Sequence, residues 1–153
     1  MNKRGIAPLI ATILLIVLAV GLGVLVMNFG RAQIEETARC SVNIGLKFVE
    51  LNTQKQVCLD KNQNQIYFIV ENGNNIEINS MNLRVIGSEE ILVTDINNKI
   101  EKLGTLMKYI DYENERYGSI KQLKLTPKVS LYGQEEYCDE QSITVENVRE
   151  CTT

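Results

Sequence analysis

The chain has 153 residues, which is room for one domain of ordinary size, and its composition (44% hydrophobic, 23% charged) is that of a folded protein. Acidic residues outnumber basic ones by 19 to 16, and no histidine occurs. This balance disfavours a nucleic-acid partner, and the commonest general base of enzymes is missing. We therefore expect no nucleic-acid binding, no enzymatic activity and no cofactor.

The first predicted element is a long apolar helix over residues 6–38. No charge occurs between Arg4 and Arg31, and the run from 6 to 27 is polar only at Thr12. A bilayer core of roughly 30 Å needs about 20 apolar residues. The run exceeds the roughly 7–15 apolar residues of a signal peptide, and no second helix of similar apolarity exists to bury it. A membrane-spanning helix is the interpretation that we prefer over these two alternatives.

The orientation of this helix follows from the basic residues before it. Lys3 and Arg4 precede the span, and the positive-inside rule places them in the cytoplasm. Residues 39–153 then form an extracellular head. Within the helix, Ala7 with Ala11 and Ala19 with Gly23 are each four residues apart, a spacing that lets helices approach closely. Such small residues are also common in transmembrane helices in general.

Beyond Cys40 the apolar period changes from 3.6 to 2, which indicates strands. Alternating apolar residues predict strands around 44–48, 66–70, 76–78, 81–85, 123–131 and 143–145, with a further strand near 107–112. Pro127 interrupts the longest run and predicts an edge, bulge or bend. The expected fold class is α+β: one hydrophobic helix followed by an all-β antiparallel sandwich.

Four cysteines, namely Cys40, Cys58, Cys138 and Cys151, lie in the predicted head. Outside the cell they can form two disulfides in three possible pairings. Zinc is disfavoured because the spacings are wide and histidine is absent. We expect Cys40–Cys58, through a strand that returns near residue 52, and Cys138–Cys151, flanking the last strand. Pairings such as Cys40–Cys151 remain open, since distant strands can be neighbours.

One acidic segment has a spacing similar to that of a calcium loop. Asp60, Asn62 and Asn64 alternate, and Glu71 is twelfth counting from Asp60. Gln65 stands where such a loop requires glycine, and a strand follows. We therefore predict a polar hairpin turn here and no metal site.

The segment Lys3-Arg-Gly-Ile-Ala-Pro-Leu-Ile-Ala-Thr12 resembles the N-terminus of archaeal type IV pilin-like proteins. The resemblance implies a leader over residues 1–5, cut between Gly5 and Ile6 by a membrane prepilin peptidase. Bacterial pilins commonly carry a glutamate fifth after the cut, where this chain has Ile10, which favours the archaeal branch. Stretches 70–73, 83–87 and 125–129 are also similar to strands and turns of pilin-like heads. The resemblance implies that the expected sandwich of the head is immunoglobulin-like or pilin-like.

The resemblance implies a structural subunit of an archaeal type IV pilus-like filament. Its partners would be copies of itself in a helical homopolymer, the prepilin peptidase and the assembly machinery, with the membrane holding the helix before assembly. The head would lie outside the cell and become part of an extracellular filament. Two alternatives remain: a minor pilin or pseudopilin, and a solitary membrane-anchored β domain that binds a ligand or surface partner.

Overall fold

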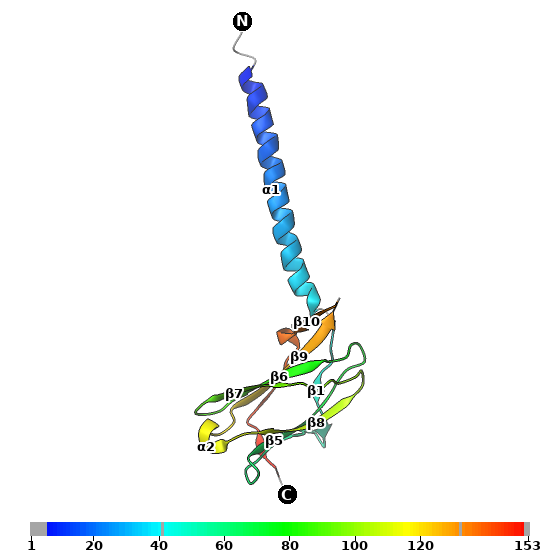
Figure 1. Ribbon diagram of the computed structural model, residues 1–153, viewed down its shortest axis with the longest axis vertical. Coiled ribbons are helices and arrows are strands. Elements are labelled where there is room, and N and C mark those ends of the chain that lie inside the picture. The colour runs from blue at the N-terminus through cyan, green and yellow to red at the C-terminus, as the bar shows by residue number, and fades with distance from the viewer. Residues whose placement is uncertain (1–5, 41, 132, 152–153) are drawn as a thin grey trace. The chain divides into compact units, whose positions relative to one another are not determined.

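The computed structural model describes residues 6–40, 42–131 and 133–151, with the side chains of helix α1 described over residues 10–30 (Figure 1). The chain divides after Arg39 into two units, the helix α1 (Ile6–Arg39) and a β-rich head that begins at Cys40. The α+β class is therefore confirmed. The helix extends one residue beyond the expected range of 6–38.

The first of two main sheets has five strands. Its order is β1-β5-β4-β12, and β8 also pairs with β5. The strands are β1 (Lys47–Phe48), β4 (Val57–Asp60), β5 (Gln65–Glu71), β8 (Thr105–Asp111) and β12 (Arg149–Glu150). Between β1 and β4, residues 50–55 form a separate two-stranded hairpin of β2 (Glu50–Leu51) and β3 (Gln54–Lys55).

The second main sheet also has five strands, in the order β10-β9-β6-β7, with β11 pairing β9. These strands are β6 (Ser80–Ile86), β7 (Ile91–Ile96), β9 (Gln122–Leu131), β10 (Gln134–Tyr137) and β11 (Ile143–Glu146). Two short helical turns complete the head: α2 (Asn114–Tyr117) and η1 (Asp139–Gln141).

Alternate residues of both sheets are buried in one shared core. Ile66, Phe68 and Val70 come from β5 and pack in the same cluster as residues of β6 and β9. Burial on one side and exposure on the other is the period-2 pattern that the sequence predicts. The buried Tyr112 keeps its polar end satisfied, because its hydroxyl donates to the carbonyl of Gly118 at 2.9 Å.

Several strand predictions need correction. β7 was not predicted, whereas residues 76–78 form only an isolated bridge between Ile78 and Ile100. The expectation of purely antiparallel pairing is wrong at one place, since β12 runs parallel to β4. This exception arises because the chain leaves the second sheet after β11 and returns to the first sheet at its C-terminal end.

Pro127 lies inside β9 rather than at an edge. β9 has neighbours on both sides, and its register with β6 is continuous through the pair Met81–Pro127. The carbonyl of Pro127 accepts a hydrogen bond from the N–H of Cys138, just where the neighbour of β9 changes from β11 to β10. In an antiparallel strand, the N and C=O of one residue point to the same side. The position of the missing N–H of Pro127 therefore faces the gap between β11 and β10, where no hydrogen bond of the β9–β6 ladder is lost.

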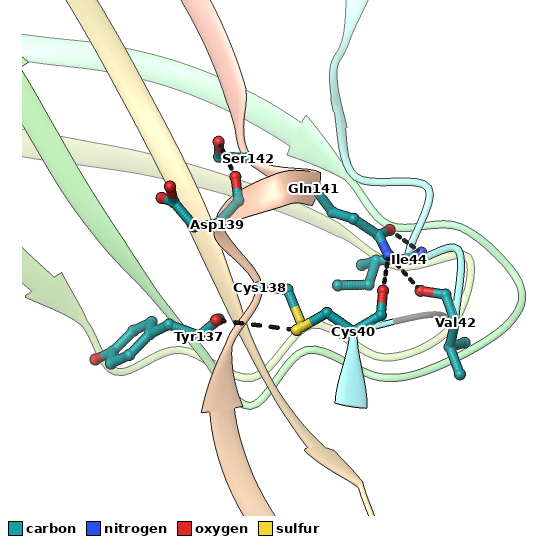
Figure 2. The surroundings of a disulfide bond; sticks show 8 residues. All are labelled: Cys40, Val42, Ile44, Tyr137, Cys138, Asp139, Gln141 and Ser142. Atoms are coloured by element: carbon teal, nitrogen blue, oxygen red, sulfur yellow. Dashed lines mark hydrogen bonds between the residues drawn. A yellow bond between two sulfur atoms is a disulfide. The ribbon is translucent and has the colours of Figure 1, made fainter. Parts of the chain in front are cut away.

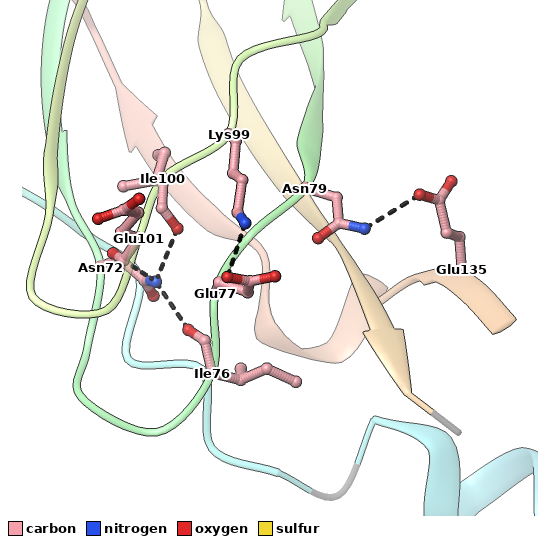
Figure 3. A network of polar contacts seen from close by, with 8 residues as sticks. All are labelled: Asn72, Ile76, Glu77, Asn79, Lys99, Ile100, Glu101 and Glu135. Atoms are coloured by element: carbon pink, nitrogen blue, oxygen red, sulfur yellow. Dashed lines mark hydrogen bonds and ion pairs between the residues drawn. The ribbon is translucent and has the colours of Figure 1, made fainter. Parts of the chain in front are cut away.

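Two crossover segments, 72–79 and 97–104, connect the sheets side by side. The N–H of Asn72 donates to the carbonyl of Gly104, and Ile78 and Ile100 exchange backbone bonds of 2.9 and 2.8 Å. The buried side-chain amide of Asn72 donates to the carbonyls of Ile76, Ile100 and Glu101 (Figure 3). This side chain thereby joins the two crossovers.

Candidate functional site

Between Ile10 and Gly30, the surface of α1 carries no charge and is apolar apart from Thr12 and Asn28. Side chains 10–29 are all exposed, and the span Ile10–Gly30 has a mean hydropathy of 3.0. Its 21 residues extend about 32 Å as a helix, which matches a hydrocarbon layer of roughly 30 Å. The helix therefore has the length and composition of a membrane anchor or a signal sequence.

The small residues of α1 lie in two groups. Ala11, Ala19 and Gly23 are exposed on the helix, and a Cβ added at Gly23 would meet no atom within 4 Å. The backbone of Ala7 belongs to the first turn of α1, but its side chain lies outside the described part. At about 100° per residue, the backbone positions 7 and 11 are centred about 120° around the helix axis from positions 19 and 23. These residues thus form two patches, suited to two different neighbouring helices.

The predicted processing residues Lys3, Arg4 and Gly5 lie outside the described residues, and Ile6 is the first residue of α1. Cleavage between Gly5 and Ile6 therefore stays a prediction.

The first residues of the head are held by what we name the Gln141 clamp, formed by Gln141 and the Cys40–Cys138 disulfide (Figure 2). The amide nitrogen of Gln141 donates to the carbonyls of Cys40 and Val42, both at 2.6 Å. The amide oxygen accepts from the N–H of Ile44 at 2.7 Å. The side chain of Gln141 thus makes hydrogen bonds to the backbone at positions 40, 42 and 44, as a neighbouring strand would. Sequence reasoning missed this role, because a glutamine in a polar stretch carries no signal of it.

A second disulfide, Cys58–Cys151, closes the C-terminal end of the head onto β4. The N–H of Cys151 also donates to the carbonyl of Leu59 at 3.0 Å, in continuation of the parallel pairing of β12 with β4. The two disulfides span 98 and 93 residues and cross each other in the sequence. Disulfides of this kind are typical of an oxidising, extracellular compartment.

The predicted pairing of Cys40 with Cys58 is therefore wrong. The prediction assumed that a strand from 41 to 51 would return beside itself. Instead, β1 pairs with Val70 and Glu71, and β4 pairs with residues 65–68, on the same side of β5. The two strands thus follow one another along β5 instead of lying opposite each other, and the segment between them forms the β2–β3 hairpin.

The predicted pairing of Cys138 with Cys151 is wrong for a related reason. Cys138 follows β10 in the second sheet, and β11 stays in that sheet beside β9. The chain then crosses to the first sheet, where β12 and Cys151 lie beside β4. The crossing of the chain after β11 therefore places the two cysteines in different sheets.

Asp139 in η1 compensates a pair of like charges. Arg84 and Lys124 lie directly opposite each other on β6 and β9, which is an unfavourable cross-strand pair. The carboxylate of Asp139 accepts a hydrogen bond from Lys124 at 2.7 Å. This bond, together with the positive charges of Lys124 and Arg84, lowers the pKa of the Asp139 carboxyl. The interaction also anchors η1, which carries Gln141.

Reactive or metal-binding chemistry has little support in the head. The part of the chain that the structure describes contains no group of three His, Cys, Asp or Glu residues that could hold a metal ion. The predicted hairpin turn after β4 is confirmed, because the Asp60 carboxylate accepts hydrogen bonds from the N–H groups of Asn62 and Gln63 at 2.9 and 3.1 Å. An open groove of about 470 Å³ beside Phe48 is bordered by the Lys47–Glu71 ion pair and has no nucleophile paired with a base.

Comparisons with known proteins return no matching family model, curated protein or solved structure. The exposed helix and the disulfide-closed head are therefore the features that bear on function.

Proposed function

We propose that this chain is a structural subunit of an archaeal type IV pilus-like filament, with α1 in the filament core and the head outside. The observation that carries the proposal is the uncharged apolar surface of α1 between Ile10 and Gly30. Fourteen large hydrophobic side chains between Ile10 and Phe29 are exposed. Burying each of them is worth about 1.5–3 kcal/mol, so water is not a stable environment for this helix.

A filament subunit gives this helix two compatible environments. Lipid can store it before assembly, and copies of the same helix can bury it afterwards, since both surroundings are apolar. The two small-residue patches, Ala7 with Ala11 and Ala19 with Gly23, support packing on more than one neighbour. The lone helix of a solitary anchor needs neither patch.

The remaining features agree with this assignment. Lys3, Arg4 and Gly5 immediately before α1 have the form of a cleavable prepilin leader. The two disulfides suit a head that works outside the cell. Two sheets that share one core support a pilin-like sandwich for the head.

The first test is the N-terminus of the mature protein. In material sheared from the surface of the native host, sequencing should begin at Ile6. Recovery of an intact Met1 from assembled filaments would contradict the pilin assignment.

The second test introduces a charge into the helix. Val17→Asp should abolish filaments, because a carboxylate in the middle of an apolar helix costs about 2.5–3.5 kcal/mol even for membrane insertion. Val17→Leu is the matched control and should assemble normally. Non-reducing peptide mapping should find both head disulfides in each variant. If the unchanged chain gives only monomers on crosslinking at native expression, the solitary anchor is the better assignment.

A further inference from the structure

A single antiparallel ribbon runs from the first sheet into the second. It starts with β5 paired to β8, continues through the hydrogen-bonded crossovers 72–79 and 97–104, and ends with β6 paired to β7. Figure 3 shows the crossovers and the Asn72 amide that joins them. Residues 91–111, which comprise β7, the crossover 97–104 and β8, thus form an edge that continues from the second sheet to the first. We name this edge the 91–111 border.

This border has no strand beside it in the described part of the chain. β7 pairs only with β6, and β8 pairs only with β5. Soluble proteins usually blunt such edges with short strands, proline or outward charges. Here β7 has six residues and β8 has seven, and each carries one exposed acidic residue, Asp95 or Asp111, beside exposed apolar side chains.

Exposed apolar residues of the head are concentrated on this border. Seven large hydrophobic residues of the described head are exposed, and five of them lie between 91 and 111: Ile91, Val93, Leu103, Met107 and Tyr109. Leu103 is 76% exposed and has a φ of 59°. A bulky residue rarely adopts this left-handed conformation, which costs about 1–2 kcal/mol, so the backbone is strained where an apolar side chain faces solvent.

The charge of the border differs from that of the rest of the head. Residues 40–153 contain 12 basic and 17 acidic side chains, a net charge of −5. Residues 91–111 contain three of each sign and are neutral. Because the border carries no net charge, a contact between the borders of two identical heads adds no net charge repulsion.

We infer that the 91–111 border is a docking surface for the head of a second copy of this chain. The free backbone groups of β7 and β8 supply hydrogen bonds, and the exposed apolar side chains supply burial. The inference rests on the proposed function only for the proximity of the heads, because a filament would hold them at high local concentration. The surface itself is a property of the head.

The experiment uses a photo-crosslinking amino acid at position 93 or 107 of the full chain, expressed in its host as a mixture of heavy and light isotope copies. The control position is Leu51 on β2, which is 57% exposed, as Val93 is. We expect heavy–light head crosslinks from 93 and 107 and none from 51. A third probe at position 17 reports helix packing separately.

Two substitutions sharpen the result. Val93→Lys should lower the crosslink yield at 107 about tenfold, whereas Leu51→Lys should leave it unchanged. Leu103→Asn should lower the yield without lowering the melting temperature, because asparagine tolerates the left-handed backbone. Crosslinks from 93 and 107 to another protein, or none at all, would overturn the inference. Crosslinks from position 17 without crosslinks from 93 and 107 would contradict the docking surface and leave the filament proposal intact. Crosslinks from 93 and 107 without crosslinks from position 17 would contradict the filament proposal and leave the docking surface intact.

Discussion

Phenylalanine has opposite environments in the two units of the chain. Phe29 on α1 is 72% exposed, whereas Phe68 in the head is fully buried. The helix makes all its backbone hydrogen bonds internally and needs no partner within the chain to be a helix, so its side chains are free to meet lipid or other chains. The head must bury one face of each strand to be stable. The apolar side chains of α1 are thus available for contacts outside the chain, whereas those of the head stabilise its fold.

The largest effect is expected when each phenylalanine is truncated to alanine. Phe68→Ala should destabilise the head by about 3–5 kcal/mol, because it removes a large side chain from the shared core. Phe29→Ala should leave the free energy of unfolding of the head unchanged. Denaturant unfolding of detergent-solubilised protein, followed by the near-ultraviolet signal of the head tyrosines, measures both. Equal effects of the two substitutions would contradict the separation into two units.

The head also differs from the helix in being closed covalently. Replacing Cys58 and Cys151 together by serine should cost about 2–5 kcal/mol and free the C-terminal end. The matched comparison is the same change at Cys40 and Cys138. Thermal unfolding of each double variant measures the cost, and peptide mapping should find the remaining disulfide with its native partner. A remaining disulfide that changes partner would show that the topology does not dictate the pairing.

A smaller effect is expected at the Gln141 clamp. Gln141→Ala removes three hydrogen bonds to residues 40–44 and should cost about 1–3 kcal/mol. Gln134→Ala, at an exposed position of β10, is the control and should be nearly neutral. Hydrogen exchange should increase at Ile44 in the first variant only. An unchanged rate there would mean that the disulfide alone holds this segment.

The smallest effect concerns pH. The pKa of Asp139 is lowered in the folded head, chiefly by its hydrogen bond from Lys124, so its ionised form stabilises the fold. This contribution is complete above the unfolded pKa of about 3.9 and is lost as the pH falls below it. Because Asp139 is largely exposed, Asp139→Asn should cost less than about 1 kcal/mol at pH 7. The difference in melting temperature from the unchanged protein should shrink between pH 5 and pH 2, since both then carry a neutral side chain.

Features that depend only on neighbouring residues could be predicted from the amino-acid sequence. An uncharged run of more than 20 residues dictates a helix that suits lipid, and the period-2 alternation around Ile66, Phe68 and Val70 dictates a half-buried strand. Asp60 with the polar residues after it was sufficient to predict a turn. Each of these signals lies within a few residues, where backbone geometry and hydropathy act directly.

Which distant segments of the chain lie side by side could be learned only from the tertiary structure. β1 and β4 lie one after the other on the same side of β5, and the chain crosses between the sheets after β11. The cysteines therefore pair as Cys40–Cys138 and Cys58–Cys151. The Gln141 clamp arises in the same way, and so does the 91–111 border, which has no strand on its outer side among the described residues. Strand order is set by the free energy of the whole core, which is a sum over residues far apart in the chain, and no local pattern encodes it.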